Sequence, residues 1–364
     1  MSTDLRATPF HARSAAANAC NAWETRNGFT LASHYGDVAR EALAARFAAV
    51  MVDLSWQPRV ILGEPTAPQF ASRLFTRDVS QLAPEEAAKA LWLNDDAGVR
   101  GVGTVVRLDR ETFVVISATG DLPWFRDAAV QFKAAASEAT GQGMLALVGH
   151  MSDRILRAAG LDPSLRPMTL RRTFWRGLDV TLSRLGLGYE LWCEPDDGSI
   201  VWDRLVAAGR SFALRPAGQL AMDILELENG VVRPGRDFAP AGEAGGPTVQ
   251  DLGLSDLVDA RQPFNGRAAF RRAGSPSRLV GLVFDTDAPM PETPLVRNGD
   301  KVGRSLGALH SPAMRQPIGL GVLDGGAPDS ELIAGSVPCR AIALPILPIP
   351  APIPPTTEVP PPPV

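Results

Sequence analysis

Residues 91–108 read LWLNDDAGVRGVGTVVRL, and this stretch predicts a β-hairpin. The apolar run Leu91–Leu93 ends at Asn94–Gly98, a cluster of Asn, Asp and Gly of the kind that forms turns. Gly103–Leu108 follows, and its valines favour a second strand. Ahead of the hairpin, Ala67–Leu74 has apolar residues at helical spacing. The stretch therefore predicts helix beside antiparallel sheet.

The rest of the chain continues this mixture up to about Pro247. Apolar spacing and N-terminal signals predict helices at Asp37–Met51, Pro84–Ala90, Pro123–Ala136, Ser152–Ala159, Ile200–Ala208 and Gly218–Glu228. Short apolar runs predict strands at Val60–Leu62, Phe113–Ser117, Met144–Val148 and Tyr189–Cys193. After Pro247, short strands separated by Gly and Pro predict a small β-barrel or sandwich. The last twenty residues contain ten prolines, which favour a polyproline II extension, either disordered or lying along the surface.

The composition excludes several classes of protein. The chain has 364 residues, 45% hydrophobic and 21% charged, as in soluble globular proteins of two or three domains. Its net charge of −4 gives no basic field for nucleic acid or anionic lipid. No stretch approaches the ~20 apolar residues of a membrane helix, and the three cysteines and four histidines lack disulfide or metal-ligand spacing. We therefore expect a cytoplasmic protein with no nucleic-acid partner, no membrane segment and no metal.

Short patterns, spread over nearly the whole chain, point to one family when they are taken in order. The eight segments are VDLS (52–55), FASRLFTRDVSQL (70–82), LWLNDDAGVRGVGTVVRL (91–108), GYEL (188–191), AMDILELENG (221–230), FNGRAA (264–269), RLVGL (278–282) and VGRSLGALHSP (302–312). Together they resemble the aminomethyltransferase family, which includes the T-protein of glycine cleavage and its tetrahydrofolate-dependent demethylase relatives. Each segment alone is a weak signal, and the shared order carries the resemblance.

The resemblance implies a fold and a cofactor. The fold is α+β and three-lobed, a ring-like protein with tetrahydrofolate in a central channel and a small C-terminal β-barrel. Residues 1–250 would form the folate-binding region of two lobes, residues 251–344 the barrel, and residues 345–364 the Pro-rich tail. The implied cofactor is tetrahydrofolate, and the expected partner is a small-molecule methyl donor bound by a monomer or a homodimer.

The chain departs from the family at positions that matter for the reaction. The family's aspartate pair, which serves aminomethyl transfer beside the folate nitrogen, falls on Gly101 and Val102. The arginine of its A-R-D motif falls on Met222, and the loop before Gly188 is shortened. Release of ammonia from an aminomethyl group needs a side chain that handles protons, which Gly and Val cannot do. We therefore expect a methyltransferase or demethylase that moves a methyl group from an O-, S- or N-methyl compound to tetrahydrofolate.

The resemblance also predicts the cofactor-binding residues Glu190, Tyr189, Asn94 and Val102. Glu190 matches the family glutamate that accepts hydrogen bonds from pterin N–H groups, and one carboxylate accepts two such donors side by side. Tyr189 is expected to stack near the pterin. Val102 occupies an aspartate position, and Asn94 lies in the hairpin turn. The structural alternatives are a strand glutamate that faces water and an asparagine that only shapes the turn.

Tyr35, His34 and Trp56 are the predicted catalytic residues. Tyr35 and His34 lie in a segment that approaches the site in relatives, and a phenol or imidazole at that place is expected to protonate a departing oxygen. Trp56 takes the place of the family's usual histidine and is expected to form a wall of the substrate slot. The alternative for all three is packing at the boundary of the core.

Two other functions stay open from the sequence alone. One is folate-dependent capture or release of formaldehyde, although the folate domains that do this usually keep the aspartate. The other is a degenerate, non-catalytic folate-binding member, because Met222 and the short loop both weaken the predicted site.

Overall fold

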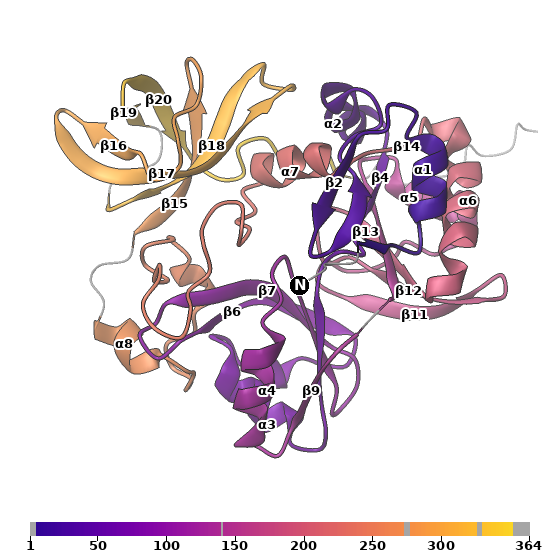
Figure 1. The fold of residues 1–364 in the computed structure, drawn as a ribbon, viewed down its shortest axis with the longest axis horizontal. Coiled ribbons are helices and arrows are strands. Elements are labelled where there is room, and N and C mark those ends of the chain that lie inside the picture. The colour runs from indigo at the N-terminus through magenta and orange to yellow at the C-terminus, as the bar shows by residue number, and fades with distance from the viewer. Residues whose placement is uncertain (1–4, 140, 273–276, 326–329, 352–364) are drawn as a thin grey trace, which may run out of the picture.

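The computed structural model describes residues 5–139, 141–272, 277–325 and 330–351. Three β-rich lobes surround the centre of the molecule, and helix α7 (Gln219–Glu228) lies between them (Figure 1). The C-terminal lobe is a closed six-stranded barrel. This is the three-lobed α+β architecture that the sequence predicts.

The first lobe is a six-stranded mixed sheet. Its strands are, in spatial order, β11 (Leu170–Trp175), β12 (Leu178–Ser183), β13 (Tyr189–Cys193), β10 (Gly143–Val148), β4 (Val50–Asp53) and β14 (Arg215–Pro216). Helices α5 (Ser152–Ala159) and α6 (Gly198–Gly209) pack on one face, while α2 (Val38–Phe47) and α7 pack on the other. Every residue of β10 and β13 is buried, as expected for strands that are covered on both faces.

The second lobe is a five-stranded antiparallel sheet. Its spatial order is β6 (Glu86–Leu93), β7 (Val99–Arg107), β8 (Phe113–Ser117), β5 (Arg59–Gly63) and β9 (Ala135–Glu138). Helices α3 (Ala67–Leu74) and α4 (Leu122–Val130) bury their apolar residues against this sheet. The predicted hairpin of residues 91–108 is present as β6 and β7.

The barrel and the smaller elements complete the fold. The barrel order is β15 (Arg278–Phe284), β18 (Gln316–Leu323), β17 (Asp300–Ser311), β16 (Pro294–Arg297), β19 (Ser330–Ala334) and β20 (Val337–Ile342). Near the N-terminus, β1 (Arg6–Ala7), β3 (Phe29–Ala32) and β2 (Trp23–Arg26) form a small sheet beside α1 (His11–Ala17). Helix α8 (Arg267–Arg272) precedes the barrel, and 3₁₀ turns lie at Val79–Gln81, Pro195–Asp197, Arg210–Phe212 and Ser255–Leu257.

The helix expected at Pro84–Ala90 is in fact most of strand β6. This strand pairs with β7 along its whole length, and Ala87 and Ala90 are buried. Alanine and glutamate favour a helix locally, but sheet pairing and burial outweigh that preference. Glu85, with a φ of +66°, makes the turn into the strand. The difference between helix and strand matters for the site, because the strand directs the side chain of Lys89 to the same face as Leu91.

Two other helices are shorter than predicted. Helix α2 ends at Phe47 and is followed by strand β4, and helix α4 ends at Val130 and is followed by strand β9. The β11–β12 hairpin was not predicted, because its alternating polar residues give no continuous apolar run.

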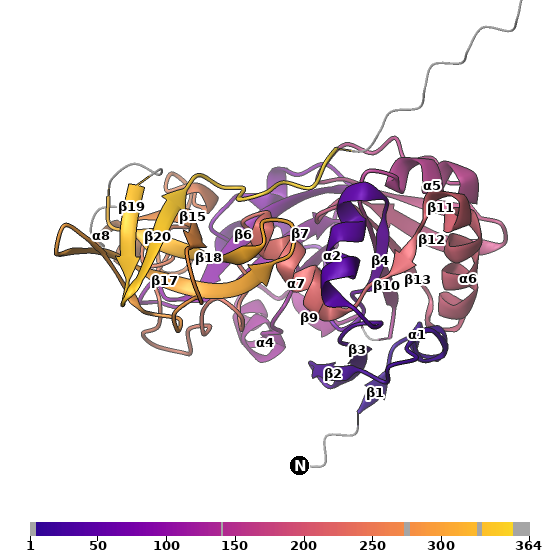
Figure 2. The same ribbon diagram turned by 90° about the horizontal axis from the view of Figure 1, so that it is seen from above.

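The beginning of the Pro-rich segment packs on the body of the protein. Figure 2 shows the chain leaving β20 and running back toward α2. The N–H of Leu347 donates to the Glu228 carbonyl at 2.8 Å, and the N–H of Ile349 donates to Asn229 Oδ1 at 3.2 Å. The Arg46 guanidinium donates to the Leu347 carbonyl at 2.9 Å. The packed fold therefore extends past Leu344, and residues 352–364 of the predicted tail lie outside the described residues.

Two truncated chains should show which part of this segment stabilises the fold. A chain that ends at Leu344 loses the hydrogen bonds of Leu347 and Ile349, so its free energy of unfolding should fall by about 1–3 kcal/mol. A chain that ends at Ile349 keeps these bonds and should melt at the temperature of the full chain. Thermal unfolding followed by circular dichroism measures both. Equal melting temperatures for the two truncations would contradict the packing role.

Candidate functional site

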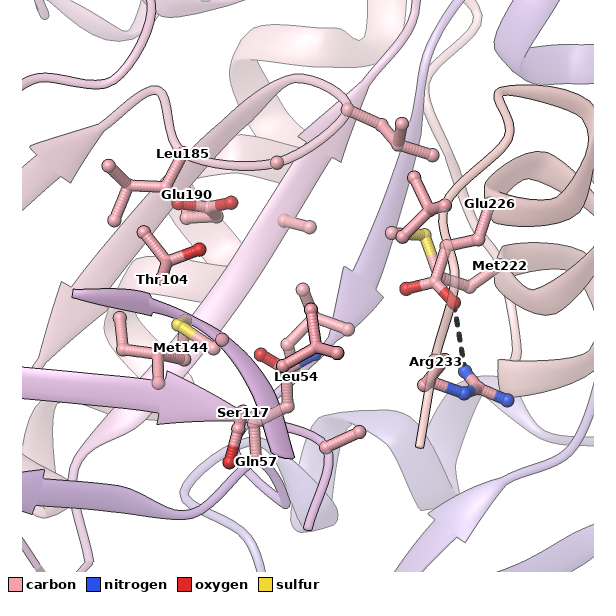
Figure 3. A pocket seen from close by; sticks show the side chains of 18 of the residues that line it. Leu54, Gln57, Thr104, Ser117, Met144, Leu185, Glu190, Met222, Glu226 and Arg233 are labelled. Carbon is pink, nitrogen blue, oxygen red and sulfur yellow. Dashed lines mark hydrogen bonds and ion pairs between the residues drawn. The ribbon is translucent and has the colours of Figure 1, made fainter. Parts of the chain in front are cut away.

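A central cavity of about 200 Å³ lies where the two sheets face α7. Strands β6, β7 and β8 form one side, β10, β13 and the loop before Gly188 form another, and α7 with residues 231–234 forms a third. Figure 3 shows these walls and the side chains that project from them. The site is therefore assembled from segments far apart in the sequence.

The cavity walls are mainly apolar, with a few polar groups among them. Its apolar lining residues include Leu54, Val102, Ile116, Met144, Ala146, Val148, Leu185, Leu187, Met222, Val231 and Val232. Its polar lining side chains are Gln57, Lys89, Thr104, Ser117, Glu190, Glu226 and Arg233. This combination is typical of a site for a small organic molecule.

Glu190 is a carboxylate fixed in an apolar wall. Its residue is only 6% exposed, and Ser183 Oγ donates to Glu190 Oε2 at 2.5 Å. The backbone N–H groups of Leu185 and Gly186 also donate to this carboxylate. Burial raises the pKa of Glu190 above its ordinary value, and these hydrogen bonds oppose the rise. Glu190 can therefore serve as a hydrogen-bond acceptor toward a ligand in the cavity.

Tyr189 lies on the opposite face of the same strand. Its hydroxyl donates to Asp153 Oδ1 at 2.8 Å and to the Pro163 carbonyl at 2.9 Å, and its ring packs among the residues between the sheet and α5. Successive residues of a strand point to opposite faces, so Tyr189 and Glu190 cannot both face the cavity. The structure does not bring Tyr189 to the predicted stacking position.

The positions of the family's aspartate pair hold no charge. Val102 lines the cavity, and Gly101 lies against the ring of Trp92. A Cβ at Gly101 would lie 2.1 Å from Trp92 Cζ2, so a side chain there would displace the indole. This wall therefore has no group at residues 101 and 102 to exchange a proton.

Asn94 is a turn residue. Its Oδ1 accepts the N–H groups of Asp96 at 3.1 Å and Gly98 at 2.8 Å. Its Nδ2 donates to the carbonyls of Gly242 at 3.1 Å and Gly245 at 2.9 Å. These bonds engage both ends of the amide in holding the hairpin against residues 242–245, and Asn94 is not among the cavity-lining residues.

Tyr35 and His34 lie away from the cavity. The Tyr35 hydroxyl is 2.7 Å from Ser14 Oγ, and burial raises the pKa of this phenol above its ordinary range. His34 Nδ1 accepts the N–H of Gly36 at 3.1 Å and lies 3.7 Å from Cys20 Sγ. Neither residue contributes to the cavity lining, so the predicted general acid is not placed beside Glu190.

Trp56 lies behind the cavity wall. Its Nε1 donates to Gln219 Oε1 at 2.9 Å, and it lines an adjoining cavity of about 330 Å³. The guanidinium carbons of Arg26 and Arg233 lie 5.1 and 6.0 Å from its ring centroid. Because Arg233 itself lines the central cavity, Trp56 supports that side chain rather than forming the wall.

Arg233 is a cavity residue that the sequence analysis missed. It forms ion pairs with Asp223 at 2.5 Å and with Glu226 at 3.0 Å. Burial would raise the pKa of Asp223, but hydrogen bonds from Arg26 and Arg233 hold it below its usual value. Figure 3 shows Arg233 on the same side of the cavity as Met222, which replaces the motif arginine. A guanidinium is therefore present in this part of the site, supplied from a different position.

Lys89 is the second missed residue. It lies on β6, lines the cavity, and donates from Nζ to Thr104 Oγ1 at 2.6 Å. Desolvation lowers the pKa of Lys89, while the carboxylates of Glu190 and Glu226 act in the opposite direction. If residues 86–93 had been predicted as a strand, Lys89 and Leu91 would have been expected on the same face. The predicted helix gave no such expectation.

Comparison with known proteins identifies the family. The model of the GCVT N-terminal domain family matches residues 10–259. The chain belongs to this family. Its members use tetrahydrofolate, as the sequence resemblance implied.

Individual relatives agree with this assignment. The aminomethyltransferase of Methylococcus capsulatus is 31% identical to this chain, over 81% of this chain and 83% of its own length. That of Frankia alni is 29% identical, over 81% of this chain and 84% of its own length. The aminomethyltransferase of Halothermothrix orenii is 28% identical, over 81% of this chain and 85% of its own. The crystal structure of the glycine cleavage aminomethyltransferase T from Bartonella henselae has a TM-score of 0.82, with 22% identity, and covers 95% of this chain and 99% of that one. The likeness to that structure confirms the predicted fold.

The described residues include no group of three or more His, Cys, Asp or Glu side chains that could hold a metal ion. In the same part of the chain, no helix has the length and hydrophobicity to cross a membrane.

Exchange of Glu190 for Gln should weaken binding of a reduced folate. The substitution keeps the size of the side chain but replaces an acceptor oxygen with a donor, which should cost about 1–3 kcal/mol, or roughly 5–150-fold in Kd. Calorimetric titration with 5-formyltetrahydrofolate measures the change. Tyr189→Phe, on the opposite face of the same strand, is the matched control and should keep the wild-type Kd. Unchanged affinity in Glu190→Gln, or an equal loss in both variants, would remove Glu190 from the site.

Proposed function

We propose that this protein is a tetrahydrofolate-dependent methyltransferase that demethylates a small O-, S- or N-methyl compound. The observation that carries the proposal is the cavity wall at Val102, where an aminomethyl-transferring site would need a proton-handling side chain; Gly101 beside it packs on Trp92 and supplies none. The remaining lining, apolar apart from a few polar groups, suits a methyl group.

The residues of the cavity fit the folate that the family uses. Glu190 would accept the N–H donors of the pterin edge, and its fixation by Ser183 keeps the acceptor in place. Arg233, whose charge is paired with Asp223 and Glu226, would present guanidinium N–H donors to the cofactor, in place of the motif arginine that is Met222 here. When bound, tetrahydrofolate supplies the nitrogen that accepts the one-carbon unit.

The remaining lining residues would orient the methyl donor. Val102, Met144 and Leu185 present apolar surface to the cavity, and a methyl group in contact with such surface is held without a polar anchor. Displacement at a methyl carbon depends on alignment of the donor and acceptor atoms, which a rigid cavity between two sheets can provide. We propose a small-molecule methyl donor as the partner. We further propose that the protein acts in the cytoplasm as a monomer or a homodimer.

Product analysis tests the proposal. The full chain, incubated with tetrahydrofolate and separately with a methoxybenzoate, a methyl thioether or trimethylglycine, should form 5-methyltetrahydrofolate from at least one donor. Chromatography of the folate products measures this. With an aminomethyl-loaded lipoyl carrier protein, methylenetetrahydrofolate and ammonia should not form.

Two results would contradict the proposal. Methylenetetrahydrofolate formed at the rate of a family aminomethyltransferase assayed in parallel would show that Gly101 and Val102 permit glycine cleavage. Tight folate binding with no methyl transfer from any donor class would favour the non-catalytic alternative. The Tyr189→Phe variant serves again as the control, because its substitution lies outside the cavity.

A further inference from the structure

Lys89 is an exposed residue whose side chain lines the cavity, and its ammonium has no countercharge in contact among the described residues. Lys89 pairs with Thr104 across β6 and β7, and its Nζ donates to Thr104 Oγ1 at 2.6 Å. Among the described residues, no Asp or Glu oxygen lies within 4.0 Å of Lys89 Nζ. An ammonium has three N–H donors, so two remain for a ligand.

The arginines near the cavity differ from Lys89 in this respect. Arg233 is held by Asp223 and Glu226, and Arg236 is held by Glu226 at 3.1 Å and Asp237 at 2.8 Å. These charges are neutralised within the protein. The charge of Lys89 is met only by the more distant Glu190 and Glu226, so a cation is available to a ligand in the cavity.

The position of Lys89 also changes the charge of one wall. Residues 89 and 91 share a face of β6, and they pair with Thr104 and Val102 of β7. The wall that has valine at the aspartate position therefore carries a lysine two residues along the neighbouring strand. A donor with a cationic methylated centre, such as a quaternary ammonium or a sulfonium, would be repelled there. A donor whose heteroatom departs with a negative charge would be stabilised.

We propose that Lys89, together with the Thr104 hydroxyl, binds the departing heteroatom of the methyl donor, so that the substrates are uncharged methyl ethers and methyl thioethers. This inference rests on the proposed methyl transfer and names its substrate class. The C–O or C–S bond breaks, its electron pair stays on the heteroatom, and the methyl carbon bonds to the folate nitrogen. Overall, the heteroatom gains one proton and the folate nitrogen loses one, and Lys89 ends the cycle protonated.

Binding of a leaving-group analogue tests this role without any methyl transfer. The probe is 4-nitrophenol, whose phenolate absorbs visible light, titrated into the full chain with and without 5-formyltetrahydrofolate. The wild-type protein should bind the phenolate, and Lys89→Met should bind it about 10–150-fold more weakly, because a hydrogen bond to a charged group is lost. Lys89→Arg should retain most of the affinity. Lys301→Met, at an exposed lysine of the barrel, is the matched control and should bind as the wild type does.

Two further probes separate charge from shape. The uncharged ether 4-nitroanisole should bind equally to wild type and Lys89→Met, and tetramethylammonium should bind no better to wild type than to Lys89→Met. Melting temperatures confirm that each variant is folded, and Lys89→Gln replaces Lys89→Met if the latter unfolds.

Three outcomes would overturn the inference: no phenolate binding by wild type, equal phenolate binding by wild type and Lys89→Met, or a preference of wild type for tetramethylammonium. These measurements follow binding and need no product. A negative result for the role of Lys89 is therefore distinguishable from a negative result for the proposed methyl transfer.

Discussion

Side chains alternate between the two faces of strand β13, and this alternation determines which of them reach the central cavity. Tyr189 and Leu191 face the core under α5 and α6, while Glu190 and Trp192 face the other side of the sheet. Ladders to β10 on one side and β12 on the other hold the register. A slip by one residue would place tyrosine in the cavity and bury a carboxylate among aliphatic side chains, at a large cost in free energy. The candidate folate site depends on this register.

The charged groups around the cavity divide into two kinds. Arg233 belongs to a network in which each charge has a partner, and such a network holds a guanidinium in a defined place. Glu190 and Lys89 are different, because neither is held by an opposite charge. Ser183 and two backbone N–H groups hold Glu190, and the Thr104 hydroxyl holds Lys89. Groups of this second kind retain hydrogen-bonding capacity for a ligand. The cavity thus presents an acceptor on one sheet and a donor on the other.

The sequence predicted the architecture well because eight short patterns fall on elements that define the lobes. Glu190 and Val102, two of the predicted cofactor-binding residues, lie within strands that the patterns cover and line the cavity, and their contact with folate stays a prediction. A motif gives a residue's position in the chain but not the direction of its side chain, and for this reason Tyr189 was expected beside the pterin although it packs under α5. Tyr35 and His34 depend on how the N-terminal segment packs on the first lobe, which no local pattern encodes.

The sequence analysis missed Lys89 and Arg233 for similar physical reasons. Lys89 lies in an alanine-rich run whose local preference is helical, so its strand geometry and cavity position became visible only with the pairing of β6 and β7. Arg233 lies in an irregular segment after α7, and its place is set by ion pairs with Asp223 and Glu226 of that helix, which form because the chain turns back on α7 and which no helix or strand pattern predicts. The packing of residues 345–349 likewise depends on α2 and α7, which are distant in the sequence.

The central claim is that Glu190 anchors a reduced folate inside the cavity between the two sheets. A crystal structure of the full chain with 5-methyltetrahydrofolate tests it most directly. The account predicts density for the pterin in this cavity, with its N–H groups within hydrogen-bonding distance of the Glu190 carboxylate. Density for the folate at another site, or a pterin in the cavity that makes no contact with Glu190, would contradict it.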